Sequence, residues 1–135
     1  MPTAATKPGA QLLTPTDHTL IMIDFQSQMA FATHSIDAVL LRNNAGLVAS
    51  AAAGFGASTI LTTVAEKTFS GPMFDEVTKP FPQEAMIDRT SMNCWEDEAV
   101  VARVNEIGKG RVVLAGLWTS VCIVGPALSA LDQGF

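Results

Sequence analysis

The chain has 135 residues, of which 48% are hydrophobic and 16% are charged, and its formal net charge is −5. This length suits one domain with a modest core, and the negative charge argues against nucleic acid or an anionic membrane as the main partner. No apolar run reaches the roughly 18 residues that a membrane-spanning helix needs, and the first residues lack the pattern of a secretory signal.

The chain begins with a polar segment and then a strand. Residues 1–15 are punctuated by proline and glycine, so we interpret them as an N-terminal arm ahead of a single domain over residues 16–135. The run Thr19–Phe25 is almost continuously apolar, which is typical of a strand buried on both faces of a parallel sheet. A loop is expected over Ser27–Asp37.

The middle of the chain predicts a helix and a second strand. Apolar residues at helical spacing predict a helix over Val39–Ala53, with Gly54 as its stop. The β-branched run Ser58–Thr63 predicts a strand. A loop over Glu66–Pro72 and a weak helix over Met73–Thr78 are expected to follow.

The last part repeats this alternation. We expect a short strand at Ala85–Asp88, a connection over Arg89–Trp95 and a helix over Asp97–Ile107. The run Arg111–Leu117 predicts the fourth strand, and Val121–Gln133 predicts the last helix. Strands that alternate with helices indicate right-handed βαβ units. The fold class is therefore α/β, a mostly parallel, Rossmann-like sheet between two layers of helices.

Three chemically useful side chains follow strands of this sheet. Ligands bind at the carboxyl ends of parallel strands, and Asp24, Arg89 and Cys122 all fall at that edge. Cys122 also lies where a strand gives way to a helix, a position at which the helix dipole lowers the pKa of a thiol. The alternative is a small buried hydrophobic residue, which is what most free cysteines are.

Several segments together resemble a known family, the isochorismatase-like cysteine hydrolases, and most closely their YcaC-like branch. The matching segments occur in the same order and at fitting spacings over Leu20–Gln26, Thr59–Thr63, Ser70–Pro72, Asn93–Asp97, Leu114–Cys122 and Pro126–Phe135. The resemblance implies a parallel six-stranded sheet with helices on both faces, and a catalytic set of Asp, Lys and Cys.

The resemblance also implies individual roles. Asp24 would be the general base and Cys122 the nucleophile, with the backbone N–H groups of Trp118 and Cys122 as the oxyanion hole. A non-proline cis peptide shapes that hole in the family, and here it would lie between Leu117 and Trp118. The chemistry is consistent, because a carboxylate can take the thiol proton and two N–H donors can stabilise a tetrahedral oxyanion.

Two features depart from the family pattern. Arg89 stands where the family carries its lysine, so the cationic role can persist while a proton relay is in doubt. Lys67 and Lys79 are alternative cations, and both are expected at the surface. The family continues for two more strands beyond the position of Phe135, so we interpret the sequence as lacking the C-terminal third, as a fragment, an incomplete sequence or a chain that truly lacks this part.

Other residues have competing interpretations. Phe25, Gln26, Asn93 and Trp118 are candidates for substrate binding, while capping is the alternative for Asn93 and core packing for the two aromatic residues. The two histidines, His18 and His34, are isolated, so no metal site is expected.

These observations lead to a functional hypothesis. The chain is interpreted as a hydrolase of a small amide or related C–N or ester bond, through a Cys122 thioacyl intermediate and without a cofactor. Alternatives are a non-catalytic protein that binds a small ligand, and an assembly subunit. The two cysteines suit a reducing cytoplasm, and the low share of charged residues favours a homo-oligomer that acts on a small-molecule substrate.

Overall fold

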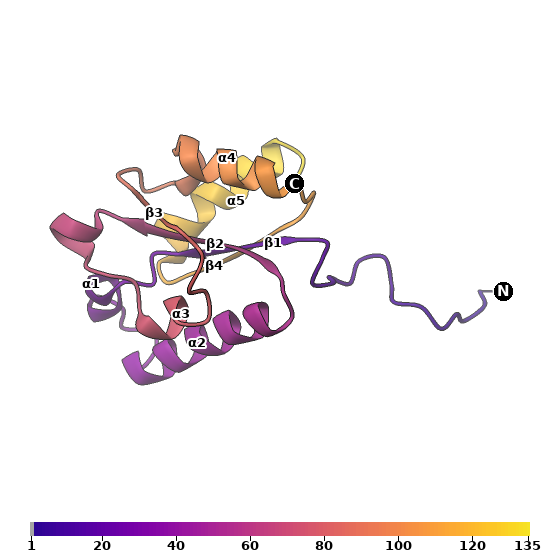
Figure 1. Ribbon diagram of the computed structural model, residues 1–135, viewed down its shortest axis with the longest axis horizontal. Coiled ribbons are helices and arrows are strands. Elements are labelled where there is room, and N and C mark those ends of the chain that lie inside the picture. The colour runs from indigo at the N-terminus through magenta and orange to yellow at the C-terminus, as the bar shows by residue number, and fades with distance from the viewer. Residues whose placement is uncertain (1) are drawn as a thin grey trace.

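A parallel sheet of four strands forms the centre of the computed structural model, which describes residues 2–135 (Figure 1). The sheet order is β3-β2-β1-β4, and every neighbouring pair is parallel. The strands are β1 (Thr19–Ile23), β2 (Ser58–Val64), β3 (Met86–Arg89) and β4 (Val112–Gly116). All four agree with the strands predicted from the sequence to within two residues at each end.

Helices cover both faces of the sheet, as the sequence predicts. One face carries α2 (Ala38–Gly54) and α3 (Asp75–Thr78), and the other carries α4 (Glu98–Ile107) and α5 (Val124–Asp132) (Figure 1). Asp37 and Asp97 begin α2 and α4, because each side chain accepts two backbone N–H groups of the first turn. The three-layer α/β/α arrangement is confirmed.

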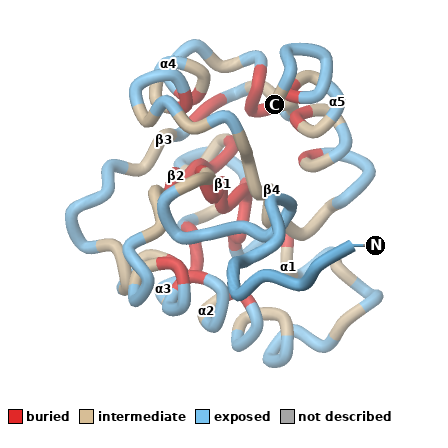
Figure 2. Tube along the Cα trace, turned by 90° about the vertical axis from the view of Figure 1, so that its right-hand side faces the viewer, coloured by how far each residue is buried: buried red, intermediate tan, exposed pale blue. Residues whose placement is uncertain are grey.

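Two apolar clusters lie on opposite faces of the central strand β1, as the alternation of side chains along a strand requires. Leu20 and Met22 pack toward α2, whereas Ile21 and Ile23 pack toward α4 and α5. All five residues of β1 are buried, which explains the unbroken apolar run in its sequence (Figure 2).

Three segments differ from the sequence prediction. The expected loop after β1 contains a short helix, α1 (Ser27–Phe31), which a single buried side chain, Met29, anchors to the core. The expected loop after β2 forms a π-helical turn over Glu66–Ser70. The predicted last helix is divided into a second π-helical turn, Thr119–Ile123, and α5. Such single turns are too short to produce a visible periodicity.

The segment of residues 2–18, which precedes β1, forms no helix or strand and is mostly exposed. Arg111 contacts it by donating hydrogen bonds to the carbonyl oxygens of Ala10, at 2.8 Å, and Leu12, at 3.4 Å. Among the helices that the structure describes, none has the length and apolar character needed to cross a bilayer.

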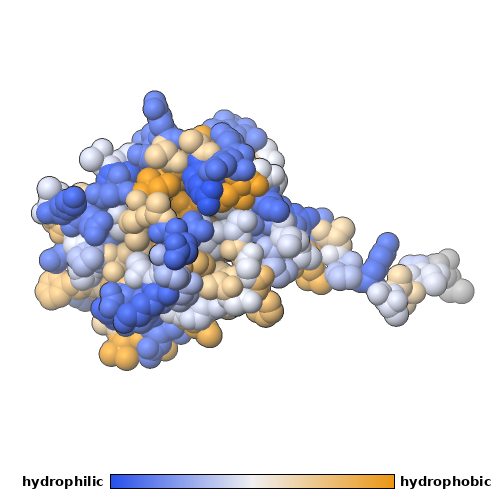
Figure 3. Space-filling view, in the orientation of Figure 1, coloured by the Kyte–Doolittle hydropathy of each residue, from blue (hydrophilic) through white to orange (hydrophobic). Residues whose placement is uncertain are grey.

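The outer side of α2 carries exposed apolar side chains. Leu40 and Leu47 in α2, and Phe55 directly after it, are 51%, 67% and 74% exposed. In the space-filling view, several apolar residues lie among polar ones at the lower margin, where α2 runs in Figure 1 (Figure 3). A helix of a small domain ordinarily turns its polar side outward, so this surface departs from the usual pattern.

Candidate active site

Asp24 and Arg89 form a buried, bidentate ion pair at the carboxyl edge of the sheet. The Nη1 and Nη2 atoms of Arg89 donate to Oδ1 and Oδ2 of Asp24, both at 2.8 Å. The two side chains are 2% and 0% exposed. The sequence places both residues at this edge, and the structure joins them across 65 positions of the chain.

The backbone at the end of β1 aims Asp24 at this partner. Asp24 has a φ of +56°, in the left-handed region that aspartate adopts more readily than most residues. Its N–H donates to the carbonyl oxygen of Thr62 at 3.0 Å, so the bend remains attached to β2. A left-handed residue at a strand end stores strain, which proteins tend to place at functional sites.

Arg89 has further acceptors that fix its orientation. Its Nη1 reaches Thr62 Oγ1 at 3.0 Å and the Thr63 carbonyl at 2.9 Å, and its Nη2 reaches the Met92 carbonyl at 3.2 Å. Burial alone would lower the pKa of Arg89, but the hydrogen bonds and charge of Asp24 raise it above its ordinary value. Arg89 is therefore a permanent cation. Its Nε is a buried donor without a protein partner in residues 2–135.

Cys122 lies in the π-helical turn that follows β4. Its side chain is 2% exposed and packs in the cluster that also contains Ile23 and Cys94. The N–H of Cys122 donates to the carbonyl oxygen of Trp118 at 2.8 Å. This donor, expected in the oxyanion hole, is therefore occupied within the turn.

The expected cis peptide between Leu117 and Trp118 is wrong for this structure. The peptide bonds of residues 2–135 are all trans, this one included. The trans form of a non-proline bond is favoured by roughly 3–4 kcal/mol. The Trp118 carbonyl meanwhile accepts from Val121 and Cys122 and begins the π-helical turn.

The thiol of Cys122 is less acidic than the sequence predicted from its position between a strand and a helix. Burial, followed by the hydrogen bond to Asp24 and its charge, raises the pKa of Cys122 to about 12, although Arg89 acts in the opposite direction. Burial likewise raises the pKa of Cys94 to about 11. Desolvation outweighs any helix dipole here, because Cys122 sits inside a π-helical turn and not in the first turn of α5.

These two thiols predict that the fold loses stability in alkali. A folded-state pKa above the unfolded value means that the folded chain holds protons that the unfolded chain releases. Their contribution is complete below about pH 9 and declines as the pH rises toward the pKa values of about 11 for Cys94 and about 12 for Cys122. The loss should be on the order of a few kcal/mol.

Chemical denaturation at a series of alkaline pH values measures this effect. The slope of the free energy of unfolding against pH should become flatter in Cys122→Ala, and flatter again in Cys94→Ala/Cys122→Ala. Equal slopes in the wild type and the double variant would contradict the raised pKa values.

Gln26 is committed to the backbone. The side chain is fully buried, and its Nε2 donates to the carbonyl oxygens of Val64 at 3.2 Å and Gly71 at 2.6 Å. Its Oε1 accepts the Val64 N–H at 3.0 Å. Both amide N–H groups are used, so Gln26 holds the end of β2 in place and offers no donor to a ligand.

Asn93 and Trp118 also make structural contacts. Asn93 Oδ1 accepts the N–H of Trp95, so the capping interpretation is confirmed, and its Nδ2 donates to Ser129 Oγ in α5 at 3.2 Å. Trp118 Nε1 donates to the Met29 carbonyl at 3.2 Å. These bonds fasten the two segments that flank Cys122.

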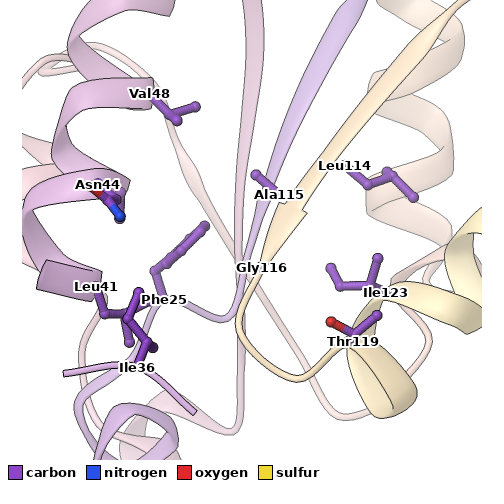
Figure 4. A pocket seen from close by; sticks show the side chains of 11 residues that line it. Phe25, Ile36, Leu41, Asn44, Val48, Leu114, Ala115, Gly116, Thr119 and Ile123 are labelled. Atoms are coloured by element: carbon purple, nitrogen blue, oxygen red, sulfur yellow. The ribbon is translucent and has the colours of Figure 1, made fainter. Parts of the chain in front are cut away.

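A pocket of about 360 Å³ opens beside this edge between α2 and the π-helical turn (Figure 4). Phe25, the neighbour of Asp24, lines it from one side, and Thr119 and Ile123 line it from the other. Ile123 also covers Gly116, where a Cβ atom would lie 2.5 Å from Ile123 Cδ1 and 2.9 Å from the Ile23 carbonyl oxygen. The side chains of Asp24, Arg89 and Cys122 do not line the pocket.

The alternative cations and ligands lie elsewhere. Lys67 is exposed, and Lys79 pairs with Asp75 on the surface at 3.2 Å, so Arg89 occupies the cationic position. His18 bonds the Thr14 carbonyl ahead of β1. Within residues 2–135 no group of three or more His, Cys, Asp and Glu side chains could hold a metal ion.

Sequence reasoning missed Thr62. This buried residue of β2 contacts Asp24 through its carbonyl oxygen and Arg89 through its hydroxyl. The sequence shows only a β-branched residue in a strand, and alternation along β2 merely places Thr62 on the same face as Ile60.

A comparison with protein families assigns the chain. The model of the Isochorismatase domain family matches residues 18–135. The chain belongs to the isochorismatase family. The family match covers all four strands and both ends of the ion pair.

Two relatives of this isochorismatase-family chain carry the name YcaC. Probable hydrolase YcaC of Escherichia coli strain K12 is 34% identical over 131 residues, which are 96% of this chain and 62% of the relative. The crystal structure of the E. coli YcaC gene product, an octameric hydrolase of unknown specificity, aligns with this chain with a TM-score of 0.88. The alignment covers 96% of this chain and 64% of the YcaC chain. YcaC from Pseudomonas aeruginosa, with hexane-2,5-diol and covalent acrylamide, aligns with a TM-score of 0.88 at 32% identity, over 96% of this chain and 64% of that one. The present chain thus spans less than two thirds of these relatives.

Proposed function

We propose that the protein is a cysteine hydrolase that acts on a small amide or a related C–N or ester bond. The observation that carries this proposal is the buried Asp24–Arg89 pair, whose two charges both act on the pKa of the buried Cys122 thiol. The family supports hydrolysis, because its YcaC relative in E. coli is a probable hydrolase. The acrylamide held covalently by the P. aeruginosa relative is a small amide whose alkene alkylates thiolates.

Asp24 would act as the base in the first step. Because the pKa of Cys122 is about 12, the resting group is the neutral thiol. As Sγ attacks the carbonyl carbon, its proton passes to Asp24 and a C–S bond forms. The C–N bond then breaks, and the amine leaves with the proton held by Asp24. Arg89 keeps the Asp24 carboxylate oriented while Asp24 gains and loses the proton.

The second step returns the enzyme to its starting state. Asp24 takes a proton from water as the oxygen attacks the thioester carbon. The C–S bond then breaks, and Asp24 returns that proton to Sγ, which gives a carboxylic acid and the Cys122 thiol. The backbone N–H groups of Trp118 and Cys122 are our candidates for stabilising the oxyanion. The Cys122 donor becomes free for this purpose only when its bond to the Trp118 carbonyl opens.

The surroundings of this chemistry are part of the proposal. Phe25 would bound the substrate through the pocket that it lines, and no cofactor is needed. We infer a cytoplasmic protein from the two free cysteines and a homo-oligomer from the exposed apolar side of α2. The octameric E. coli relative supports the latter.

An acylation assay tests the proposal. With 4-nitrophenyl acetate as the probe, Cys122 should form a thioacetate, seen as a burst of nitrophenolate and as an acetyl group on the peptide that contains Cys122. Cys122→Ala should abolish both signals, whereas Cys94→Ser should keep them. Acetylation that is absent, or spread over surface lysines in both variants, would contradict a nucleophilic Cys122.

A second candidate is a non-catalytic protein that binds a small carboxylate or amide, or an assembly subunit. It is favoured by one observation, the deep burial of Asp24, Arg89 and Cys122 away from the pocket. Saturable binding of small amides without thioacetate formation would support it.

A further inference from the structure

Thr62 holds the two partners of the buried ion pair in register. In the parallel sheet it lies opposite Ile23 of β1, which precedes Asp24, and opposite Ile87 of β3, two residues before Arg89. Its carbonyl oxygen accepts the Asp24 N–H at 3.0 Å, and its hydroxyl oxygen is 3.0 Å from Arg89 Nη1. A single residue therefore contacts both ends of the pair from the strand between them.

The hydroxyl of Thr62 has a defined direction. It donates its only hydrogen to the carbonyl oxygen of Ile87 at 2.8 Å, so toward Arg89 it can only accept. The residue is fully buried, and water cannot replace this acceptor from solvent. The buried hydroxyl therefore needs a donor at position 89, and Nη1 of Arg89 supplies it.

From this geometry we propose that Thr62 is a positioning residue for the reaction, which aligns Arg89 so that the Asp24 carboxylate is held ready for the Cys122 proton. The inference rests on the proposed function, because it concerns the same site. Thr62 touches neither the substrate nor the sulfur; it acts through Arg89.

Thr62→Val tests the inference because valine keeps the branched shape and removes the hydroxyl. Nη1 of Arg89 has two hydrogens and three acceptors, so in the variant it keeps Asp24 and Thr63 but loses the contact with the middle of β2, and the guanidinium is less firmly oriented beside Asp24. A less firmly oriented cation stabilises the charged form of a carboxylate less well, so the acid limb of the pH profile for acylation by 4-nitrophenyl acetate should move to higher pH. The acylation rate should fall by about tenfold to a hundredfold, as for small misplacements of catalytic groups.

Two further variants separate positioning from stability. Thr59→Val is the matched control, since Thr59 is also buried in β2 and its hydroxyl likewise donates to a backbone carbonyl, that of Ala57 at 3.1 Å. It should leave the acid limb unchanged. Thr62→Ser restores the hydroxyl and should return the acid limb to its wild-type position.

The outcomes distinguish this inference from the proposed function. If the wild type is acylated on Cys122 and Thr62→Val behaves like Thr59→Val, the positioning role is overturned while the hydrolase proposal stands. If the wild type is not acylated, the hydrolase proposal fails and the role of Thr62 in that reaction fails with it. NMR exchange of the Arg89 guanidinium protons then tests the geometric step alone, the alignment of Arg89 by Thr62. Faster exchange in Thr62→Val than in Thr59→Val supports it, and equal exchange overturns it.

Discussion

Arg89→Met should destabilise the fold by about 3–5 kcal/mol, because it leaves a buried carboxylate without its counter-ion. Asp24 is 2% exposed, and both of its oxygens accept from Arg89 at 2.8 Å. Methionine fills much of the space of the arginine stem but supplies no donor. The free energy of unfolding, measured by denaturant titration, gives the size of the effect.

A double-variant cycle identifies the cause of this loss. Asp24→Asn/Arg89→Met removes both charges, and asparagine tolerates the left-handed backbone of position 24. The double variant should be more stable than Arg89→Met alone, with a coupling energy of about 1–3 kcal/mol. Arg103→Met is the control, since Arg103 pairs with Glu106 at the surface and should cost no more than about 1 kcal/mol. A loss in Arg89→Met no larger than that of the control would contradict a buried ion pair.

The sequence predicted the fold well because its signals are local. The unbroken apolar run of β1 reports burial on both faces, and Asp37 and Asp97 precede the helices that they cap. The rule that parallel strands present their carboxyl ends at one edge was sufficient to bring Asp24 and Arg89 together. None of these inferences needs the packing of side chains.

The chemistry of individual groups depends on contacts that are distant in the sequence. Gln26 reads as a polar residue near the site, but its partners Val64 and Gly71 lie 38 and 45 positions away. The sequence predicted a lowered pKa for Cys122, but desolvation and Asp24 raise it. The cis peptide came only from the family resemblance, and the π-helical turn after β4 has no periodic signal.

Asp24→Asn should change the acidity of Cys122 and its reactivity in opposite directions. The hydrogen bond and the charge of Asp24 raise the pKa of Cys122, and Arg89 lowers it. Removing the carboxylate leaves Arg89 as the dominant nearby charge, so the pKa of Cys122 should fall below about 12 and more thiolate should form at a given alkaline pH. Ultraviolet titration of the thiolate in a Cys94→Ser background measures this shift.

Acylation should nevertheless decline in the same variant. If Asp24 is the base that accepts the Sγ proton, its loss should slow acylation by 4-nitrophenyl acetate near neutral pH by about 10²–10⁴-fold. A lower pKa of Cys122 together with slower acylation would show that Asp24 acts as a base. A charge that only shifts the pKa of the thiol would not slow the reaction in this way. Faster acylation in step with the additional thiolate would show that Asp24 restrains Cys122 and does not activate it.

Asp88→Asn provides the matched control for both measurements. Asp88 is an exposed carboxylate at the same end of the sheet, and it accepts from Thr63 Oγ1 at 2.9 Å and from the Glu66 N–H at 3.1 Å. It is absent from the groups that shift the pKa of Cys122. The thiol titration and the acylation rate should both match the wild type, because Asp24 is the carboxylate that acts on the pKa of Cys122 and the one we propose as its base. A change in Asp88→Asn as large as that in Asp24→Asn would mean that general surface charge, and not the buried pair, governs the thiol.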